Sequence, residues 1–269
     1  MTSLTDHLCY LYHTYVQRIR HYAEEVLANP NESENLHQMR TNTRRILTLL
    51  AEFTDYFDPF FLQKSKEFFK ELIKRSNEAR DIDVFLEHFE EYEKSLPKSM
   101  RAGLSPLKER LLTRRAREYE QLGIYLRDLE RSIEPIRFAQ AKRSDEDAKE
   151  VIKRMIAKRH KKIKKLRKKI EGCDPELLHK LRIHYKRLRY LYEMLGGLQD
   201  VSKELKHLKK VQELLGHYHD LVVQRNNILR FIQEEGFTLQ TILAAGKLAG
   251  DIEEKSEKLC KKISRKDMV

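Results

Sequence analysis

Residues 178–190 read LHKLRIHYKRLRY, and this stretch decides the fold because its apolar and basic residues recur at helical spacing. A shorter copy, LHQMRTNTRR, occupies residues 36–45. A helix turns by about 100° per residue, so a His with cations three and seven positions later presents all three on one side. Two helices that each carry such a row indicate a binding site for a polyanion.

In the longer copy, an apolar stripe at spacings of three and four predicts the buried face of a helix. A second stripe, rotated by about a quarter to a third of a turn, consists of His179, Arg182, Lys186 and Arg189. These cations therefore flank the core instead of pointing straight into water. Like charges four residues apart on a helix cost stability, so the pair Arg182 and Lys186 indicates a use in binding.

The shorter copy repeats this arrangement. Leu36, Met39 and Ile46 are expected to pack, while His37, Arg40 and Arg44 flank them. Arg45 and Arg187 follow one residue later, about 100° further round, so helical geometry favours them less. Arg binds phosphate oxygens in pairs and Lys binds them as a point charge, which makes a phosphate chain a suitable ligand for both rows.

The composition predicts an all-α protein. The 269 residues are 40% hydrophobic and 36% charged, with nine Gly, six Pro and no Trp, which favours helices over sheet. Apolar residues recur every three or four positions almost throughout. The expected helices are Leu4–Ala28, Ser33–Tyr56, Phe60–Asn77, Asp81–Ser95, Leu104–Ile133, Val151–Ile170, Asp174–Gly196, Gln199–Leu215, Asp220–Glu235 and Leu239–Ile263. Five helices thus fall in each of two halves, residues 1–140 and 141–269, separated by the polar stretch 139–147.

The lack of a recognisable targeting signal, together with the number and spacing of the cysteines, predicts a soluble, cytoplasmic protein. No run approaches the roughly 18 apolar residues that a membrane span needs, and the N-terminus does not resemble a signal peptide. Cys9, Cys173 and Cys260 are odd in number and far apart, with no CxxC pair. They are expected to be free thiols in a reducing compartment.

The net charge of +12 lies almost wholly in the second half. Within Val151–Ile170, eleven of twenty residues are Lys or Arg and none is acidic. Such a segment repels itself, and an anionic partner relieves that repulsion. A solvated helix face is the alternative interpretation. Further candidate phosphate ligands are Lys158, Lys162, Lys165, Arg114 and Arg117.

Together, these motifs resemble the CHAD domain, the conserved histidine α-helical domain. The pattern Leu-His-x-x-Arg-x-x-x-basic-Arg occurs twice, and residues 186–190, KRLRY, match closely. The resemblance extends to a segment after each copy, which reads EARDIDV at residues 78–84 and LLGHYHDL at residues 214–221. The resemblance covers nearly the whole chain.

This resemblance implies two helical bundles related by a pseudo-twofold axis, together forming one CHAD domain with a basic cavity between them. It also implies binding of inorganic polyphosphate without catalysis, cofactor or metal, with polyphosphate granules or polyphosphate-metabolising enzymes as further partners. The residues that it assigns to binding are His37, Arg40, Arg44, Arg45, His179, Arg182, Lys186, Arg187 and Arg189.

The two copies differ at two places. Arg80-Asp81 in the first half corresponds to His219-Asp220 in the second, and Leu47 stands where the second copy has Arg189. The second half-site is therefore expected to bind more tightly. Asp81 and Asp220 are expected to cap helices or to hold a neighbouring Arg, in preference to binding a metal.

Two other functions stay open. The dipeptide His219-Asp220 resembles the HD-type metal phosphohydrolases, with His179 or His184 and Asp251 as further metal ligands. Backbone-only binding of nucleic acid through Val151–Ile170 is the second alternative. That helix has no Phe, Tyr or Trp on which bases could stack, which argues against nucleic acid. No GxxxxGK loop or GxGxxG motif supports a nucleotide site of those kinds.

Overall fold

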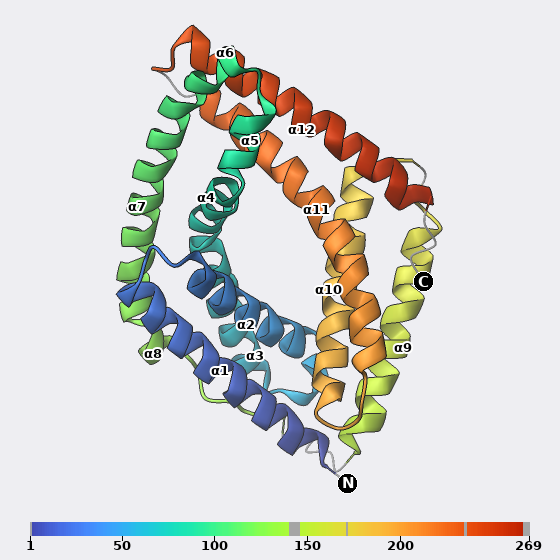
Figure 1. Cartoon of the computed structure of the whole chain (residues 1–269). Coiled ribbons are helices and arrows are strands. Elements are labelled where there is room, and N and C mark those ends of the chain that lie inside the picture. Colours follow the sequence, from blue (N-terminus) through green and yellow to red (C-terminus); the bar gives the residue numbers. More distant parts are fainter. Residues whose placement is uncertain (1, 140–145, 171, 234–235, 266–269) are drawn as a thin grey trace. The chain divides into compact units, whose positions relative to one another are not determined.

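The computed structural model describes residues 2–139, 146–170, 172–233 and 236–265 (Figure 1). Its α-helices are α1 Leu4–Ala28, α2 Ser33–Glu52, α3 Pro59–Arg75, α4 Asn77–Glu87, α5 Phe89–Ser95, α6 Lys98–Arg101, α7 Ser105–Arg127, α8 Leu129–Ser132, α9 Ala148–Arg167, α10 Pro175–Gly196, α11 Ser202–Ile232 and α12 Leu239–Arg265. Two 3-10 turns, η1 Thr54–Tyr56 and η2 Ala102–Leu104, complete them. Within these residues β-structure is confined to two isolated bridges, so the all-α prediction is confirmed.

Helix α11 corrects one sequence prediction. The sequence predicts two helices here, Gln199–Leu215 and Asp220–Glu235, with an end at Gly216, but the structure has one helix, α11, which runs without a break from Ser202 to Ile232. The buried residues Val211, Leu215 and Tyr218 continue the same stripe across the glycine. A glycine inside a helix costs only about 1 kcal/mol relative to alanine. Burial of that stripe outweighs the cost.

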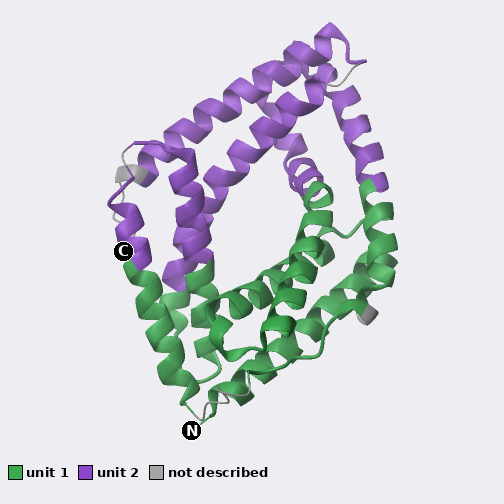
Figure 2. Cartoon of the chain, turned by 180° about the vertical axis from the view of Figure 1, so that it is seen from behind, with its two compact units in different colours: residues 1–80, 118–161, 187–205 green, residues 81–117, 162–186, 206–269 purple. Residues whose placement is uncertain are grey.

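Two compact units make up the chain (Figure 2). Unit 1 comprises residues 1–80, 118–161 and 187–205, and unit 2 comprises residues 81–117, 162–186 and 206–269. Each unit therefore takes segments from both sides of residue 140. The predicted boundary at residues 140 and 141 lies outside the described residues, and the two-repeat organisation stays a prediction.

Unit 1 is organised around α1, which packs along α2, and α2 in turn packs against α3. The rings of Tyr12 and Phe61 meet edge to face with centroids 5.7 Å apart, and Tyr12 also contacts Phe69 at 6.5 Å. Phe57 joins them through Phe61. Aromatic contacts of this kind add stability beyond the area that they bury. They fix α1 and α3, the two helices that flank α2.

Unit 2 has one continuous apolar core drawn from α4, α5, α7, α11 and α12. Ile82, Phe85 and Leu107 enter it from the N-terminal segments, and Ile228 and Leu248 from the C-terminal ones. Gly103 allows the closest approach, because a Cβ at this position would lie 2.8 Å from the Gln240 carbonyl oxygen. A side chain at this position would force the backbone near Gly103 or Gln240 to shift.

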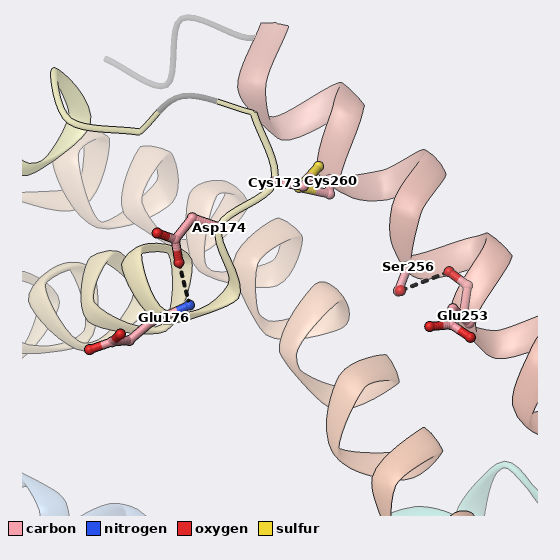
Figure 3. The surroundings of a disulfide bond; sticks show 6 residues. All are labelled: Cys173, Asp174, Glu176, Glu253, Ser256 and Cys260. Carbon is pink, nitrogen blue, oxygen red and sulfur yellow. Dashed lines mark hydrogen bonds between the residues drawn. A yellow bond between two sulfur atoms is a disulfide. The ribbon is translucent and has the colours of Figure 1, made fainter.

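A disulfide in unit 2 corrects the prediction that all three cysteines are free. Cys173 and Cys260 are bonded, which joins the segment before α10 to α12 (Figure 3), while Cys9 is a free thiol. The two cysteines lie 87 residues apart, and sequence spacing alone does not identify such a pair. The cysteines therefore give no support to a reducing compartment, and the cytoplasmic location stays a prediction.

In the described part of the chain, none of the helices combines the length and the apolar character that crossing a bilayer requires.

Candidate functional site

The α10 row consists of the predicted stripe His179, Arg182, Lys186 and Arg189, and its first three residues lie in unit 2. The Asp174 carboxylate caps this helix by accepting the backbone N–H groups of Glu176 at 2.9 Å and Leu177 at 3.1 Å (Figure 3). Leu178, Leu181, Tyr185 and Leu188 are buried, as the apolar stripe predicts. His179 is exposed, whereas Arg182 and Lys186 are half-buried. The two cations thus flank the core, in the positions that the periodicity predicts.

Helix α11 adds two groups to this row. The rings of His179 and His219 lie with their centroids 5.1 Å apart. Arg182 Nη2 is 3.9 Å from Asp220 Oδ1, so Asp220 holds an Arg, one of the two roles predicted for it. Burial lowers the pKa of His179, and the charges of Arg182 and Lys186 lower it further. His179 is therefore largely neutral at pH 7 and can offer a ring N–H without adding a full charge.

The other unit 2 candidates differ in their surroundings. The Arg114 guanidinium lies over the Phe231 ring, 5.2 Å from its centroid. Arg117, Lys162 and Lys165 are exposed. One strong pair escaped the sequence analysis: Arg115 Nε lies 2.7 Å from Asp83 Oδ1, which is buried. Asp83 lies in the EARDIDV motif, so the sequence drew attention to this segment but did not identify Arg115 as the partner of Asp83.

In unit 1, the α2 row consists of His37, Arg40 and Arg44, and these side chains differ in how deeply they are buried. Arg40 is only 5% exposed, and its guanidinium donates to the Ile73 carbonyl at 2.9 Å and to Asn77 Oδ1 at 2.8 Å. It also donates to Ser76 Oγ. These acceptors belong to the end of α3 and its continuation, so Arg40 joins α2 to α3. His37 and Arg44, on the same side of α2, are half-buried.

Arg45 and Arg189 share one carboxylate that sequence reasoning missed. Arg45 Nε donates to one oxygen of Glu193 at 2.8 Å, and Arg189 Nε donates to the other at 2.8 Å. Burial acts to lower the pKa of Arg45, but the hydrogen bond and charge of Glu193 outweigh burial, so the pKa lies above its ordinary value. The spacing of Arg189 and Glu193, four residues on one helix, was the available signal.

The remaining unit 1 candidates lie near α9. Arg159 is buried and pairs with Glu52. Burial lowers the pKa of Arg159, and the charge of Arg187 lowers it further, whereas Glu52 acts to raise it. Arg187 therefore lies within electrostatic reach of this ion pair. Lys158 is exposed, on the solvent side of α9.

The residues proposed for metal chemistry are also placed. Asp251 is paired with Lys247 one turn earlier on α12. Across the described ranges, no group of three or more His, Cys, Asp or Glu side chains is positioned to hold a metal ion. Of the metal ligands predicted with His219, His179 lies beside it, but within the described ranges no third His, Cys, Asp or Glu joins these two side chains.

Comparison with known proteins completes the description of the site. The CHAD domain family model matches residues 11–228. The crystal structure of the CHAD domain from the plant Ricinus communis is similar at 21% identity and TM-score 0.70, over 97% of this chain and 90% of that one. PptA from Streptomyces chartreusis is similar at 14% identity and TM-score 0.69, over 98% of this chain and 100% of that one. None of the curated proteins matches the chain. The two structural likenesses concern the fold.

Proposed function

Since the chain belongs to the CHAD domain family, we propose that it binds inorganic polyphosphate without chemically changing it. The observation that carries this proposal is the row on α10, where half-buried Arg182 and Lys186 follow His179 at helical spacing beside His219. Half-buried cations interact with a polyanion more strongly than exposed ones, because water and salt screen them less. Polyphosphate granules and the enzymes that make or degrade polyphosphate are further proposed partners.

The contacts of the row suit a phosphate chain. Arg182 offers paired N–H groups to phosphate oxygens, and Lys186 offers a compact charge one turn later. Asp220 lies 3.9 Å from Arg182, a distance at which an ion pair is loose. An incoming phosphate can therefore compete with Asp220 for the Arg182 guanidinium. Neutral His179 contributes its ring N–H.

The row on α2 is the weaker half of the proposed site. Arg44 and His37 are half-buried on one side of α2, while Arg40 is engaged by α3. Arg189 is already paired with Glu193. Arg40 on α2 and Arg189 on α10 are thus both engaged by other groups of the protein, and the tighter binding of the second half-site stays a prediction.

Polyphosphate binding is expected to weaken steeply with salt. If about eight phosphates are neutralised, log K against log salt has a slope of about −5 to −6, by analogy with single-stranded nucleic acid. Titrations of end-labelled long-chain polyphosphate between low and high salt measure this slope. Single-stranded DNA is the competitor, and we expect it to displace polyphosphate poorly.

Three results would contradict this proposal. A flat salt response would remove the electrostatic mechanism, and equal competition by DNA would favour backbone-only nucleic-acid binding. Release of phosphate from polyphosphate in the presence of divalent metal, abolished by His219→Ala, would show an HD-type phosphohydrolase instead of a binding protein.

Affinity is also expected to rise as the pH falls. The pKa of free His179 is lowered by burial and by its cationic neighbours, and bound phosphate raises it by favouring the imidazolium. Binding of polyphosphate therefore takes up a proton. Affinity increases as the pH falls from the pKa of His179 in the complex to the lower pKa of His179 in the free protein. We expect about a three- to tenfold gain between pH 8 and pH 5.5.

The variant His179→Gln is expected to lose most of this gain while keeping its affinity at pH 8. Exposed His207, twelve residues before His219 on α11, provides the matched control His207→Gln. An unchanged pH dependence in His179→Gln would show that this imidazole does not face the ligand.

A further inference from the structure

An open cleft in unit 1 lies outside the proposed polyphosphate row. It runs between α1 and α2 and has a volume of about 450 Å³, within the range of about 300–1,000 Å³ that small-molecule sites occupy. Its walls are lined by polar and charged residues, whose apolar atoms form about half of the exposed surface. The lining residues are Thr14, Gln17, Arg18, His21 and Tyr22 from α1, and Gln38, Asn42 and Arg45 from α2.

The cleft uses a different face of α2 from the row. Gln38, Asn42 and Arg45 follow the helix at spacings of four and three, so they share one side. At about 100° per residue, their mean direction is rotated by about 115° from that of His37 and Arg44. A ligand in the cleft would therefore contact side chains that the row does not use.

Two arginines make the cleft cationic. Arg45 is held in place by Glu193 and by a 3.1 Å hydrogen bond to Asn42 Oδ1, and its raised pKa keeps it charged. Arg18 is exposed, and among the described residues its guanidinium has no hydrogen-bond or salt-bridge partner. One fixed and one available guanidinium at the same cleft suit a small anion bearing a phosphate group.

The remaining walls can receive a planar polar ring. His21 and Tyr22 present adjacent rings with centroids 5.0 Å apart at an interplanar angle of 53°. Aromatic side chains of this kind stack with flat heterocycles. The amides of Gln17 and Gln38 can donate to and accept from the edge of such a ring.

From this combination we propose that the α1–α2 cleft binds a 5′-mononucleotide, with its phosphate on Arg18 and its base against His21 and Tyr22. Arg45 sets the positive potential of the site from its position between Asn42 and Glu193. Arg45 is also assigned to polyphosphate by the CHAD resemblance, but the groups proposed to contact the nucleotide, Arg18, His21 and Tyr22, lie outside the row, and the ligand carries a single phosphate.

Calorimetric titration of the full chain with AMP, GMP, CMP and UMP tests this proposal, with adenosine, ribose 5-phosphate and inorganic phosphate as partial ligands. We expect at least one mononucleotide to bind about tenfold or more tightly than each partial ligand, because charge pairing and stacking both contribute. Arg18→Gln should weaken mononucleotide binding at least about tenfold. Arg18 is exposed on α1, so its replacement leaves the core intact.

The control is Arg182→Gln in the unit 2 row, which should leave mononucleotide affinity unchanged, just as Arg18→Gln should leave polyphosphate affinity unchanged. The proposal is overturned if no mononucleotide binds more tightly than inorganic phosphate, or if Arg18→Gln retains full affinity. Loss of mononucleotide binding in Arg182→Gln would also overturn it, since the ligand would then occupy the polyphosphate row. Failure of the polyphosphate proposal alone would leave the Arg18 result intact.

Discussion

Reversing both charges of the α10 row, with Arg182→Glu and Lys186→Glu together, is expected to weaken binding of long-chain polyphosphate at least about 100-fold. A hydrogen bond to a charged group contributes about 1.5–3 kcal/mol, and each 1.4 kcal/mol is a factor of ten in affinity. Loss of two such contacts therefore accounts for the effect before the new repulsion is counted.

The measurement is an equilibrium titration with end-labelled polyphosphate at fixed salt, with circular dichroism to compare helix content. A matched control carries the same change of net charge at Lys180 and Lys209, both exposed on the helices α10 and α11 and each paired within its own helix. We expect the control Lys180→Glu with Lys209→Glu to weaken binding only a fewfold, through the general field of the protein. Equal losses in the two double variants would show that net charge, and not the row, determines affinity.

The variant Arg40→Met is expected to lower the free energy of unfolding by about 2–4 kcal/mol while the folded protein keeps most of its affinity for polyphosphate. Arg40 donates to the Ile73 carbonyl and to Ser76 Oγ, which are shielded from solvent by α2 and α3. Each buried acceptor that loses its donor costs about 1–3 kcal/mol. Urea unfolding measures the stability, and titration well below the transition measures the affinity.

One turn further along α2, Arg44 supplies the opposite comparison. Arg44→Met should lower polyphosphate affinity with little change in the urea midpoint, since the half-buried side chain borders the row. If Arg40→Met instead abolished binding at an unchanged midpoint, Arg40 would be a phosphate ligand and its contacts with α3 would be secondary.

Helical periodicity predicted most of the fold, because nearly every helix has an apolar stripe that must be buried. The first helix, Leu4–Ala28, has the same bounds in the structure. The predicted helix end at Gly216 is wrong because a local preference of about 1 kcal/mol is smaller than the gain from burying the apolar stripe that continues on both sides of the glycine. The pairing of Cys173 with Cys260 depends on tertiary proximity, which spacing does not encode.

The candidate site was predicted less completely. Spacing placed Arg40 and Arg44 on one side of α2, but only the position of α3 decides that Arg40 is buried and Arg44 is not. Similarly, Glu193 is visible in the sequence as a neighbour of Arg189, whereas its second contact with Arg45 joins helices far apart in the chain. The periodicity thus identifies which residues flank a core. Which of them stay available to a ligand depends on partners from other helices.

The disulfide also determines what a single proteolytic cut can do. Cys173 and Cys260 close a covalent loop that contains α10 and α11 and most of α12. A protease that hydrolyses any one peptide bond within this loop leaves the two fragments linked through sulfur. They separate only after reduction, and Cys173, which lies exposed at the surface, is the sulfur that a reducing thiol reaches first. Nicked and intact chains would therefore have the same mass by non-reducing electrophoresis and differ only once a thiol is added.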